Sequence, residues 1–197
     1  FVVTAFDTAN KALYRGDDYA NVAAGAEVTL NIDLLPVAPM LKITPHYQYV
    51  LLNDTFYVDI SIYNVPGLTS IDFTLTPTVG PFSLANIVKG ANFGDTITLV
   101  PTYGDIFQGI WLSAYHRNET GTIVDENGYA HLATVGFSSY RDWPTDTATV
   151  FLRPAVSNIY SYSNQTPPLD SIRTDEGTVR LYWEDIPPPI TWETTIG

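Results

Sequence analysis

Apolar and polar residues alternate strictly in two stretches between residues 54 and 76. The residues that share the apolar side are Phe56, Val58, Ile60 and Ile62 in the first stretch and Ile71, Phe73 and Leu75 in the second. Successive side chains of a β-strand leave opposite faces of the pleat, so each stretch predicts a half-buried strand. The residues at 64–67, Asn-Val-Pro-Gly, have turn chemistry between the two strands. We therefore expect strand, turn and strand, with Asp59, Ser61 and Asp72 facing solvent.

Similar strand signals recur along the chain, separated by clusters of Gly, Pro, Asn and Asp. We expect strands near 1–6, 11–15, 26–34, 41–44, 54–63, 70–76, 82–89, 95–100, 108–115, 129–137, 147–154 and 177–183. No window keeps a 3.6-residue period for three turns, so helices should be nearly absent. Many short strands at regular spacing predict an all-β sandwich.

Several motifs, in order, resemble cohesin modules of secreted bacterial and archaeal proteins. They are LKITP at 41–45, NVPGL at 64–68, SIDFTLT at 70–76, SLANIVKG at 83–90, GYAHLATVGF at 128–137, DSI at 170–172 and EGTVRL at 176–181. The resemblance runs from about Leu41 to Trp183 and implies a jelly-roll β-sandwich in an extracellular protein. It also implies a docking surface for a protein partner on segments 70–76, 82–88, 109–115 and 130–137.

The two ends of the chain differ from this central part. Residues 1–38 contain FVVTAFD, KALYRG and EVTLNIDLLP, which resemble the last strands of a transthyretin-like or carboxypeptidase-regulatory-like domain. We expect a short β appendage there, made of too few strands to stand alone. Residues 184–197 begin with three prolines at 187–189, an extended spacer, and continue as an alternating, strand-like tail.

Composition excludes several classes of function. The net charge is −12 with only nine Lys and Arg, which disfavours nucleic acids and anionic membranes because both require clustered positive charge. The chain has no cysteine, so disulfides, zinc–thiolate sites and thiol catalysis are absent. No apolar run approaches the roughly 18 residues of a membrane span. The chain opens on a strand-like run, so we place any leader peptide outside this numbering.

Candidate catalytic chemistry is equally sparse. His46, His116 and His131 lie far apart in the sequence, and we interpret them as surface or loop residues rather than ligands. The acidic pairs at 125–126 and 175–176 each precede a glycine before a strand, so we read them as turns rather than calcium loops. No serine has a motif with a histidine and an acid in register. We predict no enzyme activity, no catalytic residues, no metal and no cofactor.

Aromatic residues and sequons leave other possibilities open. Trp111, Trp143, Trp183 and Trp192 could stack on sugars, although core packing is the commoner use of tryptophan in β proteins. Trp143 is the one most expected to be exposed. Three sequons, at Asn53, Asn118 and Asn164, fall in predicted loops, and glycosylation there is a hypothesis.

The incomplete ends motivate a structural function. We predict a secreted or cell-surface subunit of a filament that polymerises with itself by β-strand addition, because an unpaired strand edge is a template for another chain. The candidate intersubunit residues are Phe1, Val2, Val3 and Phe6 at the front and Ile190, Trp192 and Ile196 at the back. The alternatives are a cohesin-type docking module for another surface protein and a carbohydrate-binding module.

Overall fold

The computed structural model describes residues 1–20, 29, 32, 34–77, 82–90, 93–103, 109–118, 121–139, 147–161 and 167–182. These described residues form β-strands and one 3-10 turn. The strands are β1 (Val2–Phe6), β2 (Ala12–Asp17), β3 (Leu35–Pro36), β4 (Met40–Thr44), β5 (Tyr47–Leu51), β6 (Thr55–Tyr63), β7 (Leu68–Pro77), β8 (Phe82–Lys89), β9 (Ile97–Tyr103), β10 (Ile110–His116), β11 (Ala130–Ser139), β12 (Thr147–Ser161), β13 (Arg173–Asp175) and β14 (Gly177–Tyr182). The 3-10 turn covers Leu169–Ser171. The predicted all-β class is confirmed.

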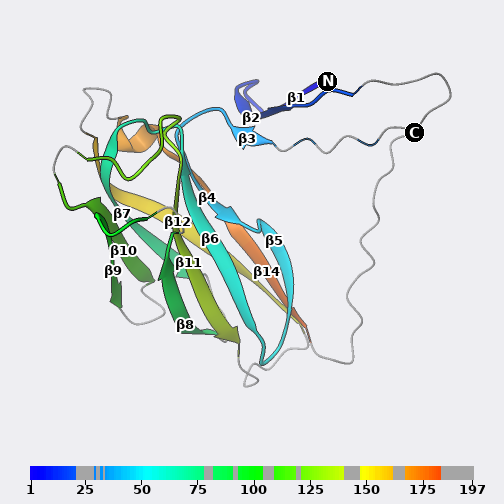
Figure 1. Cartoon of the computed structure of the whole chain (residues 1–197). Coiled ribbons are helices and arrows are strands. Elements are labelled where there is room, and N and C mark those ends of the chain that lie inside the picture. The colour runs from blue at the N-terminus through cyan, green and yellow to red at the C-terminus, as the bar shows by residue number, and fades with distance from the viewer. Residues whose placement is uncertain are drawn as a thin grey trace.

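Two sheets form a sandwich (Figure 1). One sheet has six strands in the order β5-β14-β12-β7-β10-β9, and the other has five in the order β13-β4-β6-β11-β8. A third, three-stranded sheet in the order β1-β2-β3 is set to one side of the sandwich in Figure 1.

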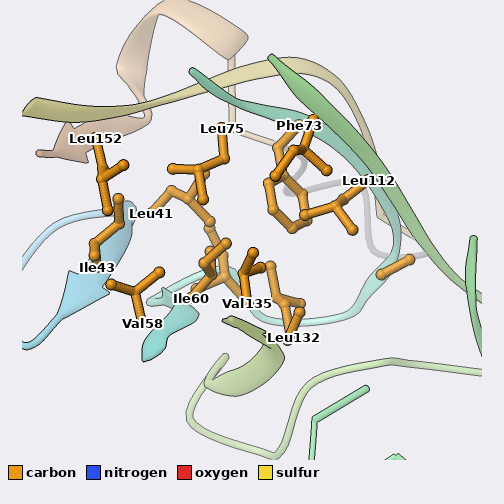
Figure 2. Packing of buried hydrophobic residues seen from close by; sticks show 14 of the residues in the cluster. Leu41, Ile43, Val58, Ile60, Phe73, Leu75, Leu112, Leu132, Val135 and Leu152 are labelled. Atoms are coloured by element: carbon orange, nitrogen blue, oxygen red, sulfur yellow. The ribbon is translucent and has the colours of Figure 1, made fainter. Parts of the chain in front are cut away.

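The core lies between the two large sheets, where apolar side chains from both inner faces interlock (Figure 2). All seven residues that the alternation placed inside are at most 3 % exposed, namely Phe56, Val58, Ile60, Ile62, Ile71, Phe73 and Leu75. The rings of Phe56 and Phe137 stack with their centroids 5.3 Å apart, and Phe82 meets Phe56 edge-on at 5.1 Å. The turn between β6 and β7 is also as expected, with positive φ at Asn64 and Gly67.

Ser61 corrects the prediction for the outer side of β6. It was expected to face solvent like Asp59, which is exposed, but only 6 % of Ser61 is exposed. β6 lies between β4 and β11, and the direct neighbours of Ser61 on these strands are Lys42 and His131. Their longer side chains share its face and cover the small serine. An aspartate at position 61 would therefore be partly desolvated.

The chain changes sheets at two corners that close the sandwich. β4 belongs to the five-stranded sheet and β5 to the six-stranded one, with a cis Thr44–Pro45 bond between them. β13 and β14 make the same change, and each pairs in parallel with its counterpart, β13 with β4 and β14 with β5. A Cβ on Gly177 at the second corner would come 2.9 Å from Cγ2 of Ile43, so glycine permits this close approach.

Some strand boundaries differ from the predicted ones. β5 and β13 were not predicted, and β12 was expected to end at Pro154 but continues to Ser161. β12 pairs with β14 up to Leu152 and with β7 from Leu152 onward. Pro154 therefore has a strand neighbour on one side only, and we infer that its missing N–H faces the unpaired side.

The small sheet is attached to the sandwich by polar contacts. The Tyr14 hydroxyl donates to Oδ2 of Asp175 at 2.8 Å, and Nζ of Lys42 lies 5.2 Å from the centroid of the Tyr14 ring. Arg173 pairs with Asp7 at 3.4 Å. Val2–Phe6 is a strand, as expected, and its partner is β2 of the same chain. The expected third strand at 26–34 lies largely outside the described residues, and so do Ile190, Trp192 and Ile196.

The Tyr14 contact predicts a pH dependence. Burial, followed by the hydrogen bond to Asp175, raises the pKa of Tyr14 above its ordinary value near 10. A raised pKa stabilises the folded state below pH ~10, and this stabilisation falls as the pH rises further, because the unfolded tyrosine ionises first. We expect the free energy of unfolding to fall more steeply above pH ~10 in the wild type than in Tyr14→Phe, as measured by urea titration. Equal slopes would show that this contact is not formed in solution.

Candidate functional site

The outer face of the six-stranded sheet carries three rows of side chains across β12, β7, β10 and β9. Residues directly opposite one another on neighbouring strands place Tyr160, Ser70, Tyr115 and Thr98 in one row, Asn158, Asp72, Ser113 and Val100 in the next, and Ala155, Thr74, Trp111 and Thr102 in the third. We call these three rows the aromatic face. The alternation of β7 and β10 creates it, because the residues between these positions point into the core.

Large rings stand exposed on this face. Trp111 is 53 % exposed, Tyr160 57 % and Tyr115 39 %. Shallow hollows lie beside them. One is lined by Asp72, Thr102, Trp111, Ser113 and Ser157 among others, and another by Thr69, Ser70, Tyr115, His116 and Tyr160. Exposed aromatic rings beside small polar residues provide both apolar contact area and hydrogen-bonding groups.

Charge is scarce on the aromatic face. Asp72 is the charged residue within its rows, and it accepts a hydrogen bond from Nδ2 of Asn158 at 3.3 Å. The backbone carbonyl of Asp72 accepts a second one from the Ser157 hydroxyl at 3.1 Å. Depletion of charge and enrichment of aromatic residues are typical of the centre of a protein-binding surface.

The docking surface that the sequence implied is wrong in one respect. Its four segments were expected on one sheet face, but β7 and β10 belong to the six-stranded sheet and β8 and β11 to the five-stranded one. The outer surfaces of these two pairs lie on opposite sides of the sandwich. The aromatic face keeps segments 70–76 and 109–115 and adds β9 and β12.

Tyr160 was not anticipated as a site residue. Alternation is absent from the sequence there, because residues 154–161 read PAVSNIYS and the pairing of β12 with β7 shifts register between Val156 and Asn158. The strand was therefore expected to stop at Pro154. For Trp111, the sequence left open which side of its strand is buried, and the structure buries Ile110 and Leu112. Trp143, Trp183 and Trp192 lie outside the described residues.

The opposite face carries a small polar network formed by side chains of β6 and β11. The Thr134 hydroxyl donates to Oδ1 of Asp59 at 2.6 Å, and Nε2 of His131 lies 3.2 Å from that hydroxyl and 3.3 Å from the same carboxylate oxygen.

The other titratable residues have structural partners. Nδ1 of His46 lies 3.4 Å from Asp175, and Nδ1 of His116 accepts from the backbone N–H of Asn118 at 3.0 Å. Oδ1 of Asp125 accepts backbone N–H bonds from residues 127 and 129, which makes its loop a turn, as predicted. Within the described ranges, no group of three or more histidines and acids could hold a metal ion.

Two of the three sequons lie in described parts of the chain. Asn53, at the turn between β5 and β6, and Asn118, after β10, are both exposed. Asn164 lies outside the described residues. Glycosylation at these positions stays a prediction. In the part of the chain that the structure describes, no helix is long and apolar enough to cross a lipid bilayer.

No family model and no curated protein sequence matches this chain. Solved structures do. A non-cellulosomal cohesin from the archaeon Archaeoglobus fulgidus is 14 % identical, with 76 % of this chain and 94 % of that one covered at a TM-score of 0.57. The seventh ScaB type I cohesin from Pseudobacteroides cellulosolvens is 17 % identical, and the match covers 79 % of this chain and 98 % of that one at a TM-score of 0.53. The cohesin–dockerin complex Coh-OlpC–Doc435 from Clostridium thermocellum contains a chain that is 13 % identical. That match covers 74 % of this chain and 92 % of that one at a TM-score of 0.53.

These likenesses extend over nearly the whole of each cohesin. The β-sandwich of this chain has the cohesin fold.

Proposed function

We propose that this chain is a non-enzymatic docking module of a secreted or cell-surface protein and that it binds a protein partner through the aromatic face. The observation that carries the proposal is the grouping of Trp111, Tyr115 and Tyr160 on one sheet face with little charge. Burial of such rings supplies most of the binding energy in protein interfaces of ordinary size.

The cohesin fold supports this reading. In the Clostridium thermocellum structure, and in one of ScaC from Acetivibrio cellulolyticus, a cohesin is bound to a dockerin. A partner of dockerin type is therefore the first to test here. The absence of an enzyme activity is part of the proposal, and it rests on the paired, structural contacts of the described histidines and acids.

The experiment is a binding screen of the 197-residue chain against a panel of purified dockerin modules by biolayer interferometry, with and without calcium. We expect at least one dockerin to bind with a dissociation constant of roughly micromolar or lower, the range in which standard-sized interfaces begin. Failure of every dockerin to bind would contradict a dockerin-type partner.

Carbohydrate binding is the second candidate, because exposed aromatic rings on a flat face can also stack on sugar rings. A glycan array separates the two. Binding of a polysaccharide that Trp111→Ala abolishes, without binding of any dockerin, would favour this candidate over the docking module.

The filament subunit that the sequence favoured is less well supported than docking, since the structures that match are cohesins and their dockerin complexes. It stays a proposal that one terminal segment, 1–6 or 190–196, adds as a strand to another copy. Large species of the full chain on gel filtration, lost when residues 1–6 or residues 190–197 are deleted, would support it.

A further inference from the structure

β1 presents one edge on which no strand of the described residues pairs. Phe1 exchanges hydrogen bonds with Asp18 through both its backbone groups, at 2.9 and 3.2 Å. The backbone N–H and C=O groups of successive residues in an antiparallel strand point alternately to its two sides. Those of Val3 and Ala5 therefore point to β2, like those of Phe1. The N–H and C=O groups of Val2, Thr4 and Phe6 therefore point to the open edge.

Several other sheet edges in the described ranges carry features that discourage pairing. β1 contains no proline and no lysine, and its pairing with β2 shifts register between Ala5 and Phe6. β3 and β13 have two and three residues. β9 contains Pro101, and β8 ends in Lys89. Short strands, proline and lysine are the means by which β proteins protect their edges.

β1, with the sequence VVTAF, has no charge and no proline. Its side chains are also unusually exposed for apolar residues, with Val2 at 60 %, Val3 at 43 % and Phe6 at 56 %. An open edge with exposed apolar side chains is the kind of strand that pairs with another chain.

We propose that β1 pairs antiparallel with β1 of a second copy of this chain, about a two-fold axis at Thr4. In this register Val2 lies opposite Phe6 of the second copy, and Thr4 lies opposite its own counterpart. Every outward N–H and C=O of Val2, Thr4 and Phe6 then has a partner, which no shift by one residue achieves.

The second copy is the occupant because the strand is complementary to itself. The register gives aromatic–β-branched pairs on both sides of a Thr–Thr pair, and both kinds of pair stabilise antiparallel sheets. A two-fold interface uses the same surface twice, so one open edge is sufficient. Each chain carries a net charge of −12, so the dimer should tighten as the salt concentration rises and the mutual repulsion is screened.

The test introduces a charge of either sign at Thr4, the residue on the two-fold axis, in the full chain. Sedimentation equilibrium measures the dimer dissociation constant of each variant. Thr4→Lys and Thr4→Glu each place like charges opposite one another and should raise the dimer dissociation constant roughly tenfold. An equal mixture of the two variants places opposite charges there and should restore it to within about threefold of the wild type. Thr4→Val is the neutral control and should dimerise like the wild type.

Amide exchange gives a second readout that does not depend on these variants. Val3 and Ala5 should be protected at all concentrations, since they bond to β2, whereas Val2, Thr4 and Phe6 should be protected only where the dimer is populated. A monomer at every concentration overturns the proposal, as does a dimer that neither charge variant weakens. Protection of Val2, Thr4 and Phe6 that is independent of concentration would also overturn it, because the edge would then be covered from within the chain.

Discussion

The Val58→Asp variant is expected not to fold at room temperature, whereas Val88→Asp should keep a melting temperature within a few degrees of the wild type. Val58 is 1 % exposed between the two large sheets, and Val88 is 52 % exposed on the edge strand β8. The two substitutions are chemically identical, so only the environment differs.

The physical reason for the difference is desolvation. An unpaired charge in an apolar core costs several kcal/mol, and a domain has only about 5–15 kcal/mol of stability to lose. At Val88 the new carboxylate stays in water. Circular dichroism of both variants decides the matter, and similar melting curves would mean that the two faces of the five-stranded sheet have been exchanged.

Much of the sandwich could be predicted from the sequence because one side of each central strand is buried. In β6 and β7 the period-two alternation specifies both the strand and its inward side, and the structure confirms every core residue assigned there. Ser61 shows the limit of this argument. Alternation predicts which side a residue faces, but it says nothing of what the neighbouring strands place over it.

The assignment of strands to sheets could not be predicted from alternation. β7 and β8 are consecutive strands, yet they belong to different sheets. Sheet membership is decided by pairings between strands that are distant in the sequence, such as β12 with β7 and β11 with β6. The predicted docking segments were therefore divided between two surfaces, and Tyr160 was absent from them.

Replacement of Trp111 by alanine is expected to weaken binding of a protein partner by roughly 30-fold or more. Trp111 lies in the third row of the aromatic face beside Thr74 and Thr102. Truncation of a central tryptophan in an interface commonly costs at least ~2 kcal/mol, which corresponds to this factor. The fold should be unaffected, because the ring is 53 % exposed and the core beneath it is formed by Ile110 and Leu112.

The matched control is Tyr57→Ala. Tyr57 is 50 % exposed, so the same kind of apolar surface is removed, but it lies on the outer side of β6 in the other sheet. A partner that binds the aromatic face should not detect this change. Equal melting temperatures for the two variants would establish that any difference in affinity comes from the surface and not from the stability of the sandwich.

The most direct test of the docking account is isothermal titration calorimetry with a dockerin that binds the wild type. This dockerin is titrated into the wild type, Trp111→Ala and Tyr57→Ala. The account predicts that Trp111→Ala loses roughly 30-fold or more in affinity while Tyr57→Ala stays within about twofold of the wild type. A loss of affinity in Tyr57→Ala with unchanged binding by Trp111→Ala would contradict it and place the partner on the five-stranded sheet.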